Sequence, residues 1–353
     1  MAEHAGPDRL LTKMTDSSTQ AFDIHGIPLL VQTELPVLAM GVADLLQRFP
    51  MAPLENGEAV RVRYRREATG LAPTPSDLSP PQGELVFSSA WDNAFDLARQ
   101  FGIGLDIYRH DEHLLFDYHR HGRLLIDTRK GVLDGCLVEP IDLHPAPLTS
   151  FFFLLPLSEL LASRGLHMIH AAALERNGRG VMIPGLSGSG KTTCCISLIR
   201  AGYRCLSDDK PFLRENGSRI ELLAFPERID VTERTISFFP ELGASLQGDL
   251  KIGYRKKQFH PEALYPGSTA ETGQPDLILF PQISGESKSR LEKLSKIRAL
   301  ETLLPHTLVV LDPELSERRF DLLARLVEGA ECYTLHFGHD VLDLPRLVDP
   351  LLE

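Results

Sequence analysis

The glycine-rich segment from Gly185 to Thr192 is the sequence feature that most constrains how this chain folds. It reads Gly-Leu-Ser-Gly-Ser-Gly-Lys-Thr and matches in full the phosphate-binding pattern G-x-x-x-x-G-K-[ST]. The pattern needs a buried strand before it and a helix after it. Residues 180–184 have the apolar composition of a short buried strand, and residues 193–201 are predicted to form a helix. Glycines let the backbone curl so that successive N–H groups face phosphate oxygens. The sequence therefore predicts an α/β unit with a strand, a glycine loop and a helix in succession.

The loop residues carry distinct expected roles. Lys191 can reach the β- and γ-phosphates of a nucleotide, and the hydroxyl of Thr192 can ligate Mg²⁺. The residues expected to bind the nucleotide are Gly185, Leu186, Ser187, Gly188, Ser189, Gly190, Lys191, Thr192 and Thr193. The alternative is a glycine-rich turn that matches the pattern by chance. The strand and the helix expected on either side argue against that alternative.

Two adjacent aspartates, Asp208 and Asp209, end a short predicted strand that begins at Arg204. In open α/β sheets, ligands bind at the carboxyl ends of strands. One carboxylate can hold the Mg²⁺ of a nucleotide, and the other can accept a proton from an attacking hydroxyl. The alternative is a solvated turn at the end of a strand. The glycine loop upstream favours the functional interpretation.

Two weaker candidates lie on neighbouring segments. His170 lies within residues 166–174, a predicted strand that turns back at Asn177 and Gly178 into the strand before the loop. A lone histidine on an apolar strand is more often a satisfied core residue than a catalyst. Glu227 follows a predicted strand and is either a further Mg²⁺ ligand or a member of an ion pair.

Composition limits the classes of partner and compartment. The chain has 353 residues, enough for about two domains. Its net charge of −11 argues against a general nucleic-acid or membrane binder, because such a chain repels phosphates at long range. Five cysteines, two of them adjacent at Cys194 and Cys195, indicate reduced thiols and a cytoplasmic location. The polar first 20 residues do not resemble a signal peptide.

The chain is predicted to divide into three parts. Residues 1–22 are expected to form a flexible tail, and residues 23–148 a smaller α+β domain for partner or substrate recognition. Residues 149–353 are expected to form the catalytic domain. The elements predicted before it are a strand at 24–31, helices at 38–49 and 94–101, a strand at 60–64, antiparallel strands within 105–127 and a proline-bearing boundary at 140–147. A buried helix is predicted at 151–162, at the start of the catalytic domain.

Taken together, these motifs resemble the HPr kinase/phosphorylase superfamily. That family has a His, a short hairpin, G-x-S-G-x-G-K-S, a helix, and then a segment ending in Asp-Asp. Here the corresponding pieces are His170, the loop Gly185–Thr192, and the segment Gly202–Asp209. HPr-kinase-related proteins such as the lasso-peptide kinases are more similar still, and phosphoenolpyruvate carboxykinase shares the nucleotide-binding core. The resemblance covers roughly residues 160–345.

The resemblance implies a fold and a set of roles. The fold would be the mixed-sheet P-loop kinase core of the HPr kinase and phosphoenolpyruvate carboxykinase type. Asp208 would be the base that activates the acceptor hydroxyl, Asp209 the metal-side acid, and His170 a support for the base or the transferring phosphoryl group. Lys191 would bind the triphosphate. The HPr kinase signature that follows the two aspartates is missing, so neither phosphorolysis nor HPr as a substrate is expected.

The function expected from the sequence is therefore an ATP- and Mg²⁺-dependent kinase acting on a hydroxyl, above all Ser of a protein or peptide. One alternative is a small-molecule kinase or a carboxykinase-like enzyme on the same core. Another is a non-catalytic, nucleotide-gated binding module. Neither nucleic acid nor a membrane is an expected partner. Assembly into a homo-oligomer is left open, since members of the superfamily often assemble.

Overall fold

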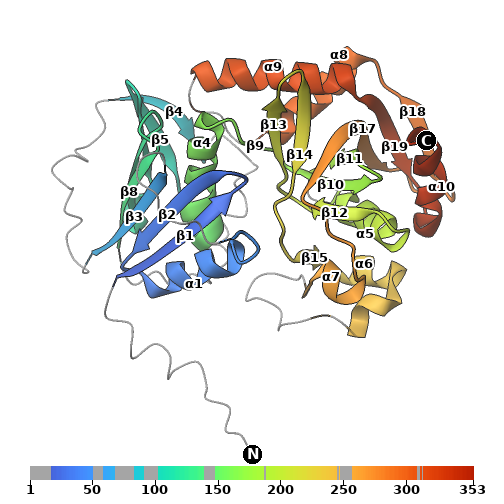
Figure 1. Ribbon diagram of the computed structural model, residues 1–353, viewed down its shortest axis with the longest axis horizontal. Coiled ribbons are helices and arrows are strands. Elements are labelled where there is room, and N and C mark those ends of the chain that lie inside the picture. The colour runs from blue at the N-terminus through green and yellow to red at the C-terminus, as the bar shows by residue number, and fades with distance from the viewer. Residues whose placement is uncertain are drawn as a thin grey trace, which may run out of the picture. The chain divides into compact units, whose positions relative to one another are not determined.

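The computed structural model describes residues 17–50, 59–67, 83–90, 102–138, 148–186, 188–244, 246, 257–307, 311 and 313–353. The chain forms two compact units, Met1–Arg164 and Gly165–Glu353, which Figure 1 shows with their elements labelled. Three predicted features lie outside the described residues: residues 1–16 of the tail, the helix at 94–101, and the boundary segment 140–147.

The N-terminal unit contains a mixed sheet with the strand order β1–β2–β3–β8–β7–β6–β5–β4. Its strands are β1 (Ser18–Ile24), β2 (Ile27–Thr33), β3 (Val60–Glu67), β4 (Glu84–Ser88), β5 (Asp106–His110), β6 (His113–Asp117), β7 (Gly122–Asp127) and β8 (Val132–Val138). The pairs β2–β3 and β3–β8 are parallel, and the other pairs are antiparallel. Helix α1 (Pro36–Leu45) lies between β2 and β3 in the chain, as a crossover between parallel strands requires. The antiparallel strands predicted within 105–127 are present as β5, β6 and β7. The sheet also contains parallel pairs, which the sequence did not predict.

The first two strands form a hairpin where the sequence predicted a tail to residue 22 and a single strand at 24–31. His25 and Gly26 adopt positive φ angles of 51° and 89° at the turn, and Asp23 accepts a hydrogen bond of 2.6 Å from the Gly26 N–H. Phe22 and Ile24 are buried, which fixes β1 against the sheet. The polar composition of the first half of β1 concealed it, although its pairing to β2 begins at Ser18.

A buried helical segment follows at the position predicted for a helix, residues 151–162. It begins with a wide π-helical turn, η5 (Ser150–Leu154), and continues as α4 (Leu155–Ser163). The hydroxyl of Tyr118 donates to the Phe151 carbonyl at 2.5 Å, and that of Tyr64 donates to the next carbonyl. These bonds satisfy carbonyls in a part of the helix whose bonding pattern is altered. Because α4 packs on β7 and β8, the units divide after residue 164 and not at the predicted 148.

The C-terminal unit contains a second mixed sheet, with the order β12–β10–β11–β17–β14–β13–β9 and with β19 and β18 added beside β17. The pairs β11–β17 and β17–β19 are parallel. The strands are β9 (His167–Met168), β10 (Ala171–Arg176), β11 (Arg179–Pro184), β12 (Arg204–Ser207), β13 (Phe212–Asn216), β14 (Arg219–Leu223), β17 (Thr272–Ile283), β18 (Arg290–Lys293) and β19 (Glu331–Phe337). Strands β15 (Ile229–Val231) and β16 (Lys257–Phe259) form a separate pair.

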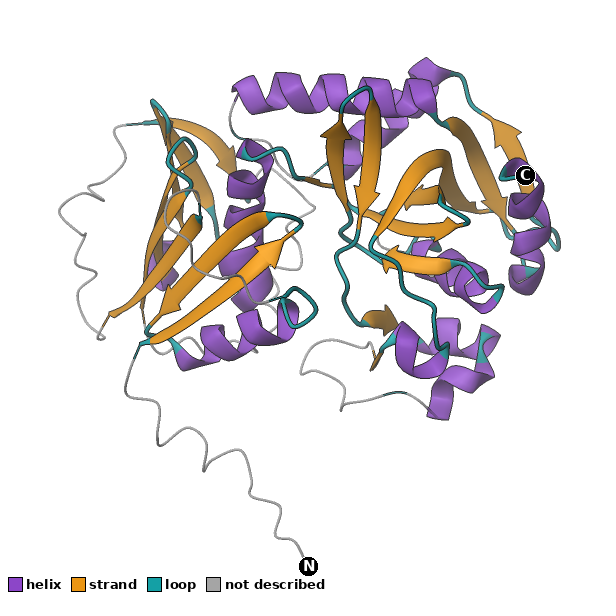
Figure 2. Cartoon of the chain, viewed as in Figure 1, coloured by secondary structure: helices purple, strands orange, loops and turns teal. Residues whose placement is uncertain are grey.

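Helices cover both faces of this second sheet, as Figure 2 shows. Ala172 and Leu174 pack with α5 (Lys191–Arg200) and α10 (Leu344–Val348), whereas Ala171 and Ala173 pack with α8 (Lys296–Leu303) and α9 (Pro313–Gly329). Successive residues of a strand point to opposite faces, so the run of small apolar residues in β10 serves both cores. Short helices α6 (Glu233–Phe238), η6 (Pro240–Ala244) and α7 (Pro261–Leu264) flank β15 and β16. The predicted mixed α/β architecture is confirmed.

Two simple properties accompany this fold. Among the described residues, no helix combines the length and the apolar character that crossing a bilayer demands. All five cysteines are free thiols, and Cys194, Cys195, Cys205 and Cys332 are buried.

Candidate phosphate-binding site

The strand register brings the separate motifs to one edge of the second sheet. Strand β10 runs antiparallel to both β11 and β12, and its first residue, Ala171, pairs with Pro184 at the end of β11. The amino end of β10 therefore lies beside the carboxyl ends of its two neighbours. His170 precedes β10, Gly185 follows β11 and Asp208 follows β12. Three motifs that are far apart in sequence thus meet at the edge where α/β sheets bind ligands.

His170 lies at a break in the strand that the sequence predicted to be continuous. Strand β9 ends at Met168 and pairs with β13, whereas β10 pairs with β11 and β12. The N–H of His170 donates to the carbonyl of His306 at 2.8 Å, and the N–H of Ala171 donates to the carbonyl of Asp209 at 3.1 Å. Because the strand is broken at this point, the side chain of His170 does not follow the alternation that buries its neighbours in the core. About one-third of its surface is exposed.

The glycine loop has the backbone that its sequence requires. Gly188 and Gly190 have positive φ angles of 86° and 100°, which residues with side chains rarely adopt. A Cβ on Gly185 would lie 2.3 Å from Oγ of Ser189, so a larger residue there would force that hydroxyl to move. That hydroxyl oxygen is buried and has no hydrogen-bond partner among the described residues. Leu186 is 59% exposed, and Ser187 lies outside the described residues.

Helix α5 begins immediately after the loop and positions the next three predicted residues. Lys191 is buried, and its Nζ forms an ion pair with Oδ1 of Asp209. The hydroxyl of Thr192 donates to Oδ2 of Asp208 at 3.0 Å. Thr193 is half-buried on the next step of the helix. The loop lysine and the loop threonine therefore contact different members of the aspartate pair.

Asp209 lies between the ammonium groups of Lys191 and Lys210 and the imidazole of His170. Its Oδ1 accepts from Nε2 of His170 at 2.9 Å in addition to the contact with Lys191, and its Oδ2 lies 3.1 Å from Nζ of Lys210. Burial alone would raise the pKa of Asp209. The charges of Lys210 and Lys191 and the hydrogen bond from His170 instead hold its pKa well below the usual range. This carboxylate therefore stays ionised at any physiological pH.

Glu227 contacts the same cluster from the segment after β14. Its Oε2 lies 2.8 Å from Nζ of Lys210, and its Oε1 lies 3.5 Å from the hydroxyl of Ser207. Burial raises the pKa of Glu227 to about 7; the charge of Lys210 opposes this effect, and the charges of the two aspartates reinforce it. Glu227, predicted as a metal ligand, is thus paired within the protein.

The oxygen atoms of Thr192 and Asp208 fit a magnesium ion that is bound together with a nucleotide. They fit less well a metal ion whose ligands all come from the protein. Mg²⁺ in nucleotide sites takes one or two protein oxygens and completes its octahedron with water and phosphate. The hydroxyl and carboxylate oxygens 3.0 Å apart provide such a pair. Across the described ranges, no group of three or more His, Cys, Asp or Glu is arranged to hold a metal.

Two residues of this site escaped the sequence analysis. Lys210 directly follows the aspartates, and its position next to them was a usable signal. His306, in the short helix η7 (Leu304–His306) after α8, is far from the motifs in sequence. Its ring centroid lies 6.4 Å from that of His170, and it is buried. Burial, reinforced by the charges of His170 and Lys191, lowers the pKa of His306 to about 4.

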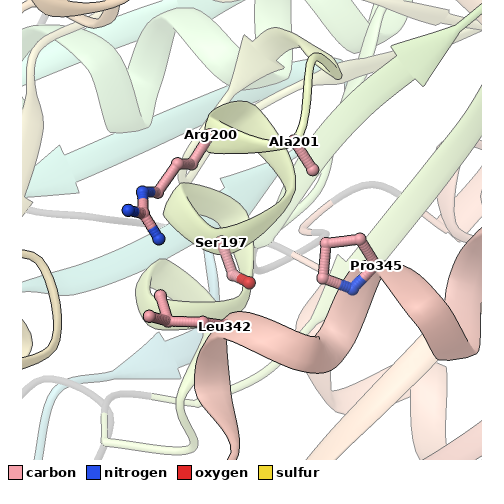
Figure 3. Close-up of a pocket in the computed structure, with 5 residues that line it drawn as sticks. All are labelled: Ser197, Arg200, Ala201, Leu342 and Pro345. Carbon is pink, nitrogen blue, oxygen red and sulfur yellow. The ribbon is translucent and has the colours of Figure 1, made fainter.

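One pocket lies elsewhere on the same helix and is separate from this site. It has a volume of about 290 Å³ and lies beside the carboxyl-terminal half of α5, as Figure 3 shows; it is lined by Ser197, Arg200, Ala201, Leu342 and Pro345. At 1.5 Å per residue, Arg200 lies about 14 Å along the helix from Lys191. Arg200 itself is paired with Glu241 at 2.9 Å. The pocket therefore does not take part in the arrangement at the glycine loop.

Comparison with known proteins adds a distant likeness to solved structures. No protein-family model and no curated protein match the chain. The Hpr(Ser) kinase/phosphatase from Coxiella burnetii matches with 15% sequence identity over 52% of this chain and 93% of that chain, with a TM-score of 0.29. The two chains are therefore similar only distantly, and the argument for function depends on the residues of the site.

Proposed function

We propose that this protein is a kinase that uses ATP and Mg²⁺ and transfers the γ-phosphoryl group to a hydroxyl, with Ser of a protein or peptide as the acceptor. The observation that carries the proposal is the meeting of Lys191, Thr192, the two aspartates and His170 at one sheet edge. A glycine loop alone indicates phosphate binding. The adjacent acids and the histidine add the groups that phosphoryl transfer uses.

The nucleotide phosphates would lie against the loop amides and Nζ of Lys191. The N–H groups at the start of α5 add the positive end of the helix dipole. Lys191 is paired with Asp209 in the structure. When a triphosphate binds, the ammonium group of Lys191 would be shared between Asp209 and the phosphates. Thr192 and Asp208 would hold Mg²⁺, which when bound neutralises charge on the β- and γ-phosphates.

The contacts favour a division of roles between the aspartates opposite to the one that the resemblance implies. Asp208 accepts a bond from the magnesium-side hydroxyl of Thr192, which is the position of a metal-side acid. Asp209 contacts His170 and is about one-third exposed, so an acceptor hydroxyl can reach it. Its low pKa makes it a hydrogen-bond acceptor that orients the hydroxyl. Phosphoryl transfer with a loose transition state depends mainly on such positioning.

The acceptor class comes from the likeness of the motifs to the HPr-kinase-related proteins. A protein or peptide substrate also gives a role to the N-terminal unit, because the residues of the candidate site described above all belong to the C-terminal unit. We propose that this unit recognises the substrate chain. ATP as the nucleotide is proposed on the same basis.

The test is transfer of ³²P from γ-labelled ATP, with Mg²⁺, to arrays of peptides that contain Ser, Thr or Tyr. We expect label on Ser peptides with the wild-type chain. Lys191→Ala should lower transfer by at least about 100-fold, because one preorganised charge on the transition state is lost. Wild-type protein that binds ATP tightly but labels no peptide and hydrolyses no ATP would contradict the proposal. Equal transfer by Lys191→Ala would contradict it as well.

A further inference from the structure

We propose that Lys210 is a positioning residue that fixes the carboxylate of Asp209, and that Glu227 serves as the anchor of Lys210 and does not bind magnesium. The inference rests on the proposed phosphoryl transfer and names two residues that act behind its reacting groups. It assigns Lys210 a role, and it replaces the metal-ligand role that the sequence suggested for Glu227.

The first step is the way Asp209 is held from two sides. One oxygen, Oδ1, contacts His170 and Lys191, which face the glycine loop. The other oxygen, Oδ2, contacts Nζ of Lys210 at 3.1 Å. A carboxylate held through both oxygens cannot rotate about its Cβ–Cγ bond without breaking one set of contacts. Lys210 therefore determines which oxygen Asp209 presents to the glycine loop.

The second step is that Lys210 is itself fixed. The hydroxyl of Ser207 accepts the N–H of Asp209 at 3.2 Å and the N–H of Lys210 at 2.9 Å, which forms a tight turn after β12. The side-chain Nζ of Lys210 then lies 2.8 Å from Oε2 of Glu227. Burial alone would lower the pKa of Lys210, but the charges of Glu227 and Asp209 raise it, so the lysine stays charged. Backbone and side chain are thus both restrained.

The third step concerns Glu227. Its two oxygens are engaged inside the protein, one by Lys210 and the other, more weakly, by Ser207. Its side chain is 15% exposed, against 36% for Asp209. A carboxylate that is this enclosed and already paired with an ammonium group stabilises that group. Thr192 bonds to Asp208, whereas the bonds of Glu227 go to Lys210 and Ser207.

The anchor and metal-ligand roles for Glu227 predict different behaviour in a double-mutant cycle. The variants are Lys210→Met, Glu227→Gln and the two combined, assayed with Mg²⁺ and γ-labelled ATP, with water as the acceptor. We expect Lys210→Met to lower kcat by about 10- to 100-fold, because a small displacement of a reacting group has an effect of that size. The KM for ATP and the Mg²⁺ concentration for half-maximal rate should change by less than about threefold, and Lys210→Arg should recover part of the rate.

The combined variant separates the two roles of Glu227. If it acts only through Lys210, adding Glu227→Gln to Lys210→Met changes kcat by less than about twofold. If Glu227 binds magnesium, the Mg²⁺ requirement rises in both backgrounds, and that result would overturn the anchor role. A kcat for Lys210→Met equal to that of the wild-type protein would overturn the positioning role.

A matched control comes from another buried acid of the same sheet. Glu175 is fully buried and paired with Arg204, but it lies toward the opposite end of β10 from His170. Glu175→Gln removes a buried carboxylate charge without touching the site, so kcat and the Mg²⁺ requirement should stay at wild-type values. A similar loss of kcat in this control would assign the Lys210 effect to general destabilisation and overturn the proposal.

A second readout does not depend on enzymatic activity. In protein labelled with ¹⁵N-histidine, the Nε2 signal of His170 reports its bond to Asp209, which is 2.9 Å in the structure. Lys210→Met should shift this signal, and Glu175→Gln should not. An unchanged His170 signal would overturn the positioning role. If the signal shifts but neither the wild-type protein nor any variant binds or hydrolyses ATP, the proposed function fails while Lys210 still positions Asp209.

Discussion

Two acidic residues of the second sheet, Glu175 and Asp209, show how a structural ion pair differs from a functional cluster. Glu175 is fully buried, pairs with the single cation Arg204, and accepts the N–H of Gly178 at 2.8 Å. Asp209 is 36% exposed and contacts two ammonium groups and the imidazole of His170. The first carboxylate is saturated and closed to ligands. The second lies at an open edge with two ammonium groups, Lys191 and Lys210, beside the glycine loop, where positive charges and backbone amides can attract a phosphate.

The same arrangement explains how an acidic chain can bind a polyanion. The net charge of −11 repels phosphates at long range. At the sheet edge, however, Lys191 and Lys210 lie together with the glycine-loop amides and the start of α5. Local attraction over a few ångströms exceeds the screened repulsion from distant surface charges.

The largest expected difference between the two acids is in catalysis. Asp209→Asn keeps the shape of the side chain but removes the charge that orients the acceptor. We expect kcat to fall by about 100- to 10,000-fold, the usual contribution of a positioned acid–base group. Glu175→Gln should keep kcat within about twofold. Steady-state kinetics with γ-labelled ATP measures both, and similar losses in the two variants would remove the distinction between them.

For the free energy of unfolding, the larger effect is expected at Glu175 and the smaller one at Asp209. Arg204→Met leaves Glu175 fully buried without its cation, and such an uncompensated charge costs about 3–5 kcal/mol. Lys210→Met should destabilise less, because Asp209 keeps His170 and Lys191 as partners, and Glu227, whose pKa is already raised to about 7, can take up a proton. Urea unfolding of the two variants beside the wild-type protein measures the difference. A larger loss for Lys210→Met would mean that the site cluster, not the Glu175 pair, is the structural one.

The sequence predicted the local half of the site and missed the half that depends on tertiary structure. The loop residues and the two aspartates are recognisable because each motif is continuous in the chain. His170 was a weak candidate on its residues alone, because its role depends on the register that places Ala171 opposite Pro184. His306 had no signal, since tertiary contacts bring it to the site: the hydrogen bond between its carbonyl and the N–H of His170, and the antiparallel bridge between Ile169 and Thr307.

The fold shows the same limit. Short apolar runs and turn signals located β10, β11, β12 and the strand before Glu227. Strand β1 was missed because its first residues are polar and its burial depends on pairing with β2. The parallel pairing of β3 with β2 and β8 was missed because alternation in a single strand does not encode the direction of its neighbours.

A smaller effect should separate the two aspartates from each other. Asp208→Asn weakens the oxygen pair that it forms with Thr192, so a higher Mg²⁺ concentration is needed to reach the same rate. We expect the half-maximal Mg²⁺ concentration to rise about 10-fold, at the low end of what changes near a metal site produce. Asp209→Asn should leave that concentration almost unchanged. The opposite pattern would restore the assignment that the resemblance implies, with Asp208 at the acceptor and Asp209 at the metal.

A pH-dependent effect concerns two buried histidines, one beside the site and one away from it. His167 and His306 are each 7% exposed, and each has a pKa lowered to about 4. For His167 the causes are burial and then the charges of Arg319 and Arg318. Below about pH 6.5 the unfolded chain binds a proton at each histidine that the folded chain refuses until about pH 4. The free energy of unfolding therefore falls, as the pH decreases through this window, by about 1.4 kcal/mol per pH unit for each histidine.

Glu227 acts in the opposite direction, because its pKa is raised to about 7 and the folded chain keeps a proton that the unfolded chain releases. Comparing each variant with the wild-type protein cancels that contribution. His167→Phe should flatten the curve of unfolding free energy against pH between 6.5 and 4 by about 1.4 kcal/mol per pH unit, and His306→Phe should do the same. Urea unfolding at half-unit pH steps gives the curves. Curves parallel to the wild-type curve would mean that these imidazoles are protonated in the folded protein, and that burial does not exclude charge beside the site.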